Sequence, residues 1–397
     1  MQRGNRLPVR AVGVVFALAA ALAACGGESS PSDRWRGTMT TLPNGAVVVS
    51  NPDRGMWSAA EAWALTEDLR IGRAEGEGPD VFWGIAGFGV APNGDVFVID
   101  RSQEIRRFQS TGELVRAFGR QGEGPGEFID AFGMAFDPDG NAWIADGGSK
   151  RYSVFSAAGT LQRTLPMIVL TFATPWEGVF DREGRLYEGS ISVAPDWSHV
   201  AFTSVRLDRA GRIDTVRDLG DTVALIKGFP LPDMVGRQVF SFDAGGTVWR
   251  GRTDRYRIIH QRLDTGDTLR IVERPLAPVP ITDAEKDSLA RQYKLVGIQA
   301  SDVPDARPLF QRIYGGPDGT LFVQLVTSPS ATESVFDVFD QEGRFLGQLL
   351  TPTRLVDAMG EPPPRVHGDG IYGIVKDSLG VPSLVRYRIT KPGGGTP

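Results

Sequence analysis

Two stretches of the chain repeat each other. Residues 88–119 read FGVAPNGDVFVIDRSQEIRRFQSTGELVRAFG, and residues 132–165 read FGMAFDPDGNAWIADGGSKRYSVFSAAGTLQRTL. Asp100 of the first stretch matches Asp146 of the second. Self-similarity at a fixed period of about 20–50 residues is typical of repeat architectures. The chain therefore stacks similar units around one core, although its 397 residues would also suit two or three unrelated domains.

Each repeat has the pattern of a small antiparallel sheet. A short apolar strand leads to an Asn-Gly or Asp-Gly turn, and a second strand, an alternating third strand, another glycine turn and a fourth strand follow. Asn-Gly and Asp-Gly between apolar runs indicate hairpins, because these turns need positive φ angles. One unit is therefore predicted to be a four-stranded meander.

Degenerate copies of this unit begin near residues 180, 242 and 316, which makes five full units. Partial units remain at 41–52 with 63–72, and at 370–389. Such sheets cannot bury both faces alone, whereas radial closure buries all of them. If N-terminal and C-terminal strands pair in one blade, the result is an all-β propeller of six four-stranded antiparallel blades; seven follow if 39–72 forms its own blade.

One insertion interrupts the strand pattern. Thr282 followed by Glu285 is a capping-box signature, which predicts a short helix over 283–293 outside the ring. We expect one propeller domain over 37–390, closed by its terminal strands, and a disordered tail over 391–397.

The first 24 residues have the features of a secretory signal. Arg3, Arg6 and Arg10 precede an apolar run over 11–24 that is short for a spanning helix. The following Leu22-Ala23-Ala24-Cys25-Gly26 resembles the lipobox of bacterial lipoproteins and contains the only cysteine. We therefore predict acylation of Cys25, a flexible tether over 25–36, and a lipid-anchored protein of the bacterial cell envelope, on the outer membrane or the periplasmic face.

Charge excludes one class of partner. Removal of the signal leaves 40 basic against 48 acidic residues, so the formal net charge falls from -5 to -8. Nucleic-acid binding draws most of its affinity from clustered lysine and arginine, and this chain has no basic run. The single cysteine also leaves the folded part without a disulfide or a thiolate site.

The units at 88–119 and 132–165 resemble NHL repeats. The segments GRQGEGPGEF (119–128), GRAEGEGP (72–79) and GVPSLVRYRI (380–389) resemble those of the bacterial extracytoplasmic six-bladed β-propeller lipoproteins that carry NHL-like blades. The resemblance implies the fold and the extracytoplasmic location. It does not imply an activity, because propellers carry unrelated functions.

Two groups of side chains are candidates for binding. The glycine-rich linkers would bring Arg73, Arg120, Glu123 and Glu127 to one rim, where exposed backbone N–H groups can hold an anion. The alternative is a purely structural loop, closed by burial of Phe128 and by pairing of Arg120 with a glutamate. Trp83 and Trp197, in loops, could form a platform for a sugar or peptide, or could instead seal packed blades.

These observations favour a membrane-anchored binding or scaffold module that engages an envelope protein, peptide or glycan. We predict no metal ligands and no cofactor, because the acids of FDPDGN (136–141) suit turn chemistry and the three histidines are scattered. The alternative is an envelope hydrolase or lyase with a divalent cation in the central channel, as in propeller lactonases. No catalytic motif favours that alternative.

Overall fold

The computed structural model describes residues 34–167, 176–228, 235–357 and 360–392, without the side chains of 191 and 220–224. The predicted signal peptide, Cys25, the first part of the tether and the last residues of the tail lie outside these ranges. Among the described residues, no helix has both the length and the apolar character needed to cross a membrane.

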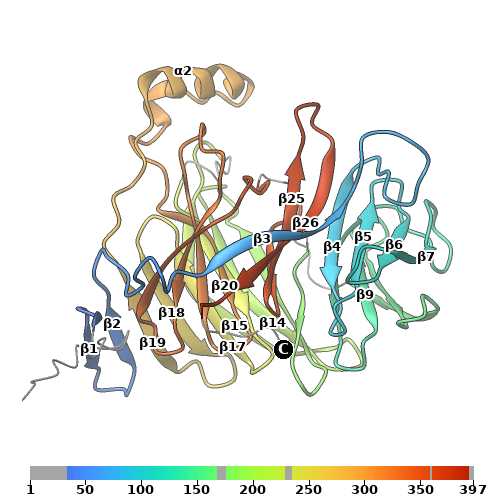
Figure 1. Ribbon diagram of the computed structural model, residues 1–397, viewed down its shortest axis with the longest axis horizontal. Coiled ribbons are helices and arrows are strands. Elements are labelled where there is room, and N and C mark those ends of the chain that lie inside the picture. The colour runs from blue at the N-terminus through green and yellow to red at the C-terminus, as the bar shows by residue number, and fades with distance from the viewer. Residues whose placement is uncertain (1–33, 168–175, 229–234, 358–359, 393–397) are drawn as a thin grey trace, which may run out of the picture.

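Six antiparallel sheets follow one another along the chain and form the blades of a propeller (Figure 1). Blades 1 to 3 are β4–β7 (Ile85–Val90, Val96–Asp100, Ile105–Phe108, Leu114–Phe118), β8–β11 (Ala131–Phe136, Ala142–Asp146, Arg151–Phe155, Leu161–Pro166) and β12–β15 (Val179–Phe180, Leu186–Val193, His199–Leu207, Ile213–Ala224). Blades 4 to 6 are built around β16–β19 (Gln238–Phe242, Thr247–Arg252, Arg257–Arg262, Thr268–Glu273), β20–β23 (Phe310–Gly315, Leu321–Leu325, Val335–Phe339, Phe345–Leu350) and β24–β26 (Arg365–His367, Gly370–Lys376, Pro382–Thr390). The predicted six-bladed fold is confirmed.

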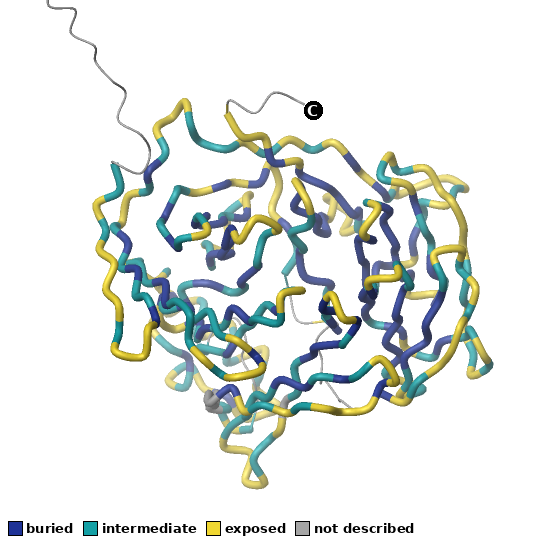
Figure 2. Tube along the Cα trace, turned by 90° about the horizontal axis from the view of Figure 1, so that it is seen from below, coloured by how far each residue is buried: buried dark blue, intermediate teal, exposed yellow. Residues whose placement is uncertain are grey.

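Within a blade, the burial of each strand follows its distance from the centre. Every residue of β5 and β9, the second strands of their blades, is buried, whereas β7 at the outer edge is largely exposed. Figure 2 shows the same gradient, with buried segments inside the ring and exposed segments outside. The turn glycines Gly94 and Gly140 have φ angles of 86° and 78°, which side chains with a Cβ rarely adopt.

The ring closes by pairing the two ends of the domain. The strand β3 (Ala64–Ile71) forms the outer edge of blade 6 and runs antiparallel to β26, with Ile71 opposite Leu384. Leu69 and Ile71 of β3 are buried in the core between blades 6 and 1. The predicted composite blade is therefore confirmed for 64–71.

The segment before β3 departs from the prediction. The hairpin of β1 (Thr38–Thr41) and β2 (Val47–Ser50) forms no seventh blade and does not join β3; instead, β2 pairs in parallel with β19 and extends blade 4 to six strands. The Asn51 amide explains this position, because its Nδ2 donates to the Gly343 carbonyl at 2.9 Å while its Oδ1 accepts from the Phe345 N–H at 2.7 Å. These bonds to blade 5 fix the hairpin.

The predicted helix is present as α2 (Asp283–Gln292), and it has the predicted capping box of Thr282 and Glu285. None of its residues is fully buried, and two short 3-10 turns follow it, η1 (Lys294–Val296) and η2 (Ala300–Asp302). A small separate core of Ile281, Ile298 and Val303 supports this insertion, which stands at the edge of the sheets (Figure 1).

Candidate functional site

The strand order gives the propeller two different faces. In every blade, one end of the sheet holds both the start of the first strand and the turn between the second and third strands. We call this end the entrance face; it carries the linkers between blades and the α2 insertion. The other end, which we call the exit face, carries the turns between first and second and between third and fourth strands.

The six candidate binding residues from the sequence lie on the entrance face, in two separate linkers and one turn. Arg73 pairs with Asp80 at 2.5 Å within the linker into blade 1, and Arg120 pairs with Glu127 at 2.6 Å within the linker into blade 2. The Gly124 N–H and then Arg120 lower the pKa of the Glu127 carboxyl. The Glu123 side chain is exposed.

The glycine-rich linker is held mainly by structural contacts. Phe128 is fully buried, and the Arg151 guanidinium donates to the carbonyls of Glu123, Gly124 and Glu127 at 3.1, 2.9 and 2.9 Å. The N–H groups of Gly122, Gly124 and Glu127 also donate within the loop. Because an anion would have to compete with these bonds, the loop geometry favours the structural interpretation of this segment.

The acids that the repeats share also serve the backbone. Asp100 accepts from the Trp83 N–H at 3.2 Å, and Asp146 accepts from the N–H groups of Ile129 and Asp130 at 3.1 and 2.9 Å. Both carboxylates are fully buried. Each one therefore ties the linker at the start of its blade to the end of the second strand.

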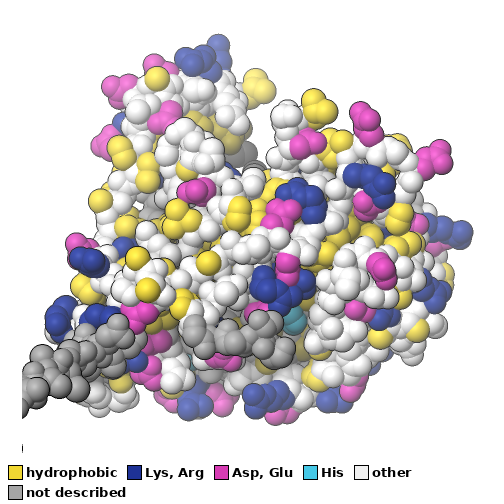
Figure 3. Space-filling model, viewed as in Figure 1, with side chains coloured by type: hydrophobic (Ala, Val, Ile, Leu, Met, Phe, Trp, Pro, Cys, Tyr) yellow, Lys and Arg dark blue, Asp and Glu magenta, His cyan; other side chains and the backbone are white. Residues whose placement is uncertain are grey.

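The most exposed of the large apolar side chains lie on the entrance face. The large hydrophobic residues more than 60% exposed among the described residues are Trp83 (89%), Trp197 (61%), Leu295 (102%) and Leu379 (81%). Each lies in a linker or in a turn between second and third strands. Figure 3 shows a notch at the top of the molecule, between the α2 side and the β25–β26 hairpin, with hydrophobic side chains on both sides.

The exit face has a different composition. In five of its turns an aspartate accepts the N–H groups two and four residues further on, and these residues are Asp137, Asp181, Asp208, Asp243 and Asp340. The turn interpretation of the Asp-Gly segments is therefore supported by their geometry.

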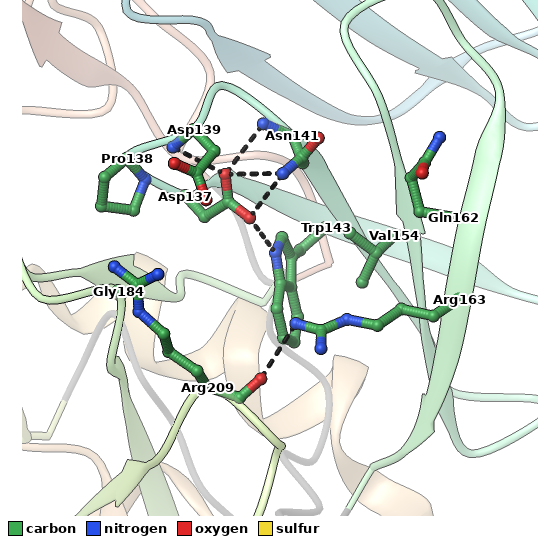
Figure 4. Close-up of a pocket in the computed structure, with 10 residues that line it drawn as sticks. All are labelled: Asp137, Pro138, Asp139, Asn141, Trp143, Val154, Gln162, Arg163, Gly184 and Arg209. Atoms are coloured by element: carbon green, nitrogen blue, oxygen red, sulfur yellow. Dashed lines mark hydrogen bonds between the residues drawn. The ribbon is translucent and has the colours of Figure 1, made fainter.

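A cavity of about 320 Å³ opens on the exit face between blades 2 and 3 (Figure 4). Of its two acids, Asp137 and Asp139, Asp137 accepts from Asn141 and from the Trp143 indole, each at 3.0 Å, so its oxygens are occupied. Arg163 lies over the Trp143 ring and donates to the Arg209 carbonyl at 2.9 Å. The bonds of Asp137 therefore stay within blade 2, and the bond from Arg163 joins blade 2 to blade 3.

Two arginines cross the centre of the ring, and sequence reasoning missed both. Arg312 of β20 in blade 5 pairs with Asp357 at 2.8 Å and reaches Glu177, at the start of blade 3, at 3.8 Å. Arg365 of β24 in blade 6 donates to the Met134 carbonyl of blade 2 at 3.4 Å. These contacts join blades that are not neighbours, so they span the central channel.

The channel charges differ in how well they are compensated. Burial lowers the pKa of Arg312, but Asp357 and Glu177 outweigh it and raise that pKa overall. Burial also lowers the pKa of Arg365, and the attraction of Glu177 does not reverse the shift. The pKa of His367, two residues further on, is lowered by burial and then by Arg365.

A signal for Arg312 was present in the repeats. The third residue of the innermost strand is Gly87 in blade 1 and Gly133 in blade 2, and the corresponding residue of β20 is Arg312. Gly133 has no room for a side chain, because a Cβ there would lie 2.3 Å from the Trp176 carbonyl oxygen. A charged residue at a position that is glycine elsewhere marks a change of role.

Within the described ranges, no three histidine, cysteine, aspartate or glutamate side chains gather in a way that could hold a metal ion. The channel instead carries the Arg312 and Arg365 guanidinium groups together with the Asp357 and Glu177 carboxylates.

Comparison with known proteins supports the fold. No protein-family model and no curated protein matches the chain. Among solved structures, a Bacteroides fragilis protein described as exported is similar over 87% of this chain and all of its own length, with 12% identity and a TM-score of 0.54. A DUF4221 family member from Bacteroides vulgatus (84% and 100% covered, 10% identity, TM-score 0.46) and virginiamycin B lyase from Staphylococcus aureus (82% and 99%, 13%, 0.43) are also similar. At these identities the likeness concerns the fold alone.

Proposed function

We propose that this chain is a lipid-anchored, extracytoplasmic NHL-like propeller that binds a protein partner of the cell envelope through its entrance face. The observation that carries the proposal is the concentration of the most exposed hydrophobic side chains on that face. These side chains come from four parts of the ring, and exposed apolar surface rimmed by polar residues is typical of interaction sites.

The apolar tips are also fixed in place. The Leu379 N–H donates to Asp377 at 2.9 Å, the Trp83 N–H donates to Asp100, and the Trp197 N–H donates to the Ala194 carbonyl at 2.9 Å. Ordered anchors lose little conformational entropy on binding. Two of the four tips are leucines, which offer no flat face for a sugar ring to stack on, so they favour a protein over a glycan.

The anchor makes a separate prediction. We expect Cys25→Ser to move the protein from the membrane fraction to the soluble envelope fraction without altering its fold, because a single acylated cysteine would supply the whole attachment. Fractionation with immunoblotting, together with the circular dichroism of the purified variant, measures this. An unchanged membrane fraction would refute the anchor.

Partner binding can be tested in cells by site-specific photo-crosslinking. A photoreactive residue at position 83 should give a discrete protein adduct, and the double change Leu295→Ser with Leu379→Ser should reduce its yield roughly tenfold, because such anchors dominate interface energetics. The control is the same photoreactive residue at Ser110, in an exit turn, which should give no adduct. An equal adduct from position 110, insensitivity to the double change, or an adduct that muramidase digests would contradict the proposal.

A further inference from the structure

The Arg365 guanidinium is the least compensated charge in the central channel. Among the described residues, no carboxylate lies within 4.0 Å of it; its contacts are the Met134 carbonyl and the Phe88 ring, whose centroid is 5.8 Å from Cζ. Its Nε is buried without a hydrogen-bond partner in the part of the chain that the structure describes. A desolvated, unpaired charge is costly and calls for an explanation.

Unused acceptors lie in the same cluster. Asp357 gives Oδ1 to Arg312, but its Oδ2 is buried without a partner among the described residues. Glu177 lies 3.8 Å from Arg312 and keeps 39% of its side chain exposed, so solvent reaches it. Glu177 attracts Arg365 but forms no ion pair with it. The channel thus offers unused donors and unused acceptors that do not meet.

The balance of charges in this cluster limits the class of ligand that the channel can bind. Arg312 and Arg365 together carry two positive charges, and Asp357 and Glu177 carry two negative charges. The Arg237 guanidinium, just before blade 4, also acts on the nearby Tyr314, but it is held by partners of its own, among them the Gln311 carbonyl at 3.1 Å. A simple carboxylate would satisfy Arg365 but leave excess negative charge beside Glu177, and a phosphate would leave more. A metal cation would be repelled by the two guanidinium groups. A ligand with both charges keeps the cluster neutral, which matters because Coulomb energies are large where water is excluded.

We propose that the entrance end of the central channel binds a small zwitterion of the α-amino-acid class, with its carboxylate on Arg365 and its ammonium group on Glu177 and the free oxygen of Asp357. Arginine matches a carboxylate in a planar, two-bonded geometry, and carboxylates accept from ammonium groups. Arg312 is a positioning residue that holds both acids. This site does not depend on the protein partner proposed for the rim.

The experiment is titration calorimetry on the full-length protein, purified from membranes in detergent. The probes are the twenty standard amino acids and D-alanine, each tested alone. We expect saturable binding of at least one of them. Its N-acetyl derivative, which lacks the ammonium group, and its methyl ester, which lacks the carboxylate, should each bind about tenfold more weakly or worse.

The variants separate the two halves of the site. Arg365→Gln and Glu177→Gln should each weaken binding by about tenfold or more, whereas Arg70→Gln, which removes an exposed arginine on β3, should leave it unchanged. If the Arg365→Gln variant fails to fold, the Glu177→Gln variant still tests the proposal, because Glu177 is only partly buried. Absence of saturable binding up to about 10 mM, tight binding of the N-acetyl derivative, or wild-type affinity in Glu177→Gln would overturn the proposal. Photo-crosslinking from position 83 is read independently of this result.

Discussion

Replacing Asp337 with alanine is expected to lower the free energy of unfolding by about 3–5 kcal/mol. The carboxylate is fully buried between blades 4 and 5, where it accepts from the Tyr256 hydroxyl at 2.6 Å, the Arg274 guanidinium at 2.5 Å and the Gln348 amide at 2.9 Å. Burial raises the pKa of Asp337 in spite of Arg274. Alanine would leave the buried arginine without its counter-charge and the tyrosine without its acceptor.

Urea unfolding followed by tryptophan fluorescence measures this loss. The control is Glu67→Ala, which removes an exposed ion pair with Arg70 and should cost less than about 1 kcal/mol. A second variant, Arg274→Met with Asp337→Leu, removes both charges and should recover much of the stability. If Asp337→Ala unfolds within about 1 kcal/mol of the wild type, the network contributes little to the packing of these blades.

The repeat pattern was sufficient to predict the architecture because each unit follows local rules. Glycine turns such as Asn93-Gly94 set the hairpins, and strand segments such as 96–99 are apolar throughout because sheets cover both of their faces. The capping box at Thr282 is equally local. These features depend on neighbours within a few residues, and the sequence shows such neighbours directly.

The position of the N-terminal hairpin could not be predicted in this way. Its attachment depends on Asn51, which bonds to residues almost 300 positions away in the sequence. It also depends on the parallel pairing of β2 with β19, which the sequence pattern of β2 does not indicate. The alternation of apolar and polar residues along a strand does not predict long-range contacts made by single polar side chains. The channel arginines were missed for the same reason, since their partners come from other blades.

The burial of two tryptophans in loops could not be predicted from the sequence pattern either. Trp176 and Trp83 both precede an innermost strand, yet Trp176 is 1% exposed and Trp83 is 89% exposed. The two side chains differ in whether the indole N–H has a hydrogen-bond acceptor. The Trp176 indole N–H donates to Glu188 of β13 at 2.6 Å, so the whole ring can be buried. The indole of Trp83 has no such bond among the described residues, and buried indoles usually need one.

That acceptor leads to a prediction about pH. Glu188 is 1% exposed and accepts from Trp176 and from the Tyr152 hydroxyl at 2.8 Å, without a cation among its bonded partners in the described structure. Burial raises the pKa of its carboxyl from 4.5 to about 7, against the effect of these two hydrogen bonds. The folded protein therefore binds this proton more tightly than the unfolded chain does.

The sign follows from this linkage. Below about pH 4.5 the carboxyl is protonated in both states, and its favourable contribution to folding is complete; the contribution is lost as the pH rises through about 7. The shift corresponds to about 3 kcal/mol. A glutamine keeps the shape and the neutral hydrogen bonding of the protonated acid, so Glu188→Gln should match the wild type near pH 5 and exceed its unfolding free energy by about 3 kcal/mol near pH 8.

The difference between variant and wild type, measured by urea unfolding at the two pH values, isolates Glu188 from the many surface carboxylates whose pKa values are lowered. Glu113→Gln, a change at an exposed acid in an exit turn, should shift stability by less than about 0.5 kcal/mol at both pH values. If the Glu188→Gln difference is the same at both, the carboxylate is ionised in the folded protein across this range. Its burial between Tyr152 and Trp176 would then be compensated by hydrogen bonds alone.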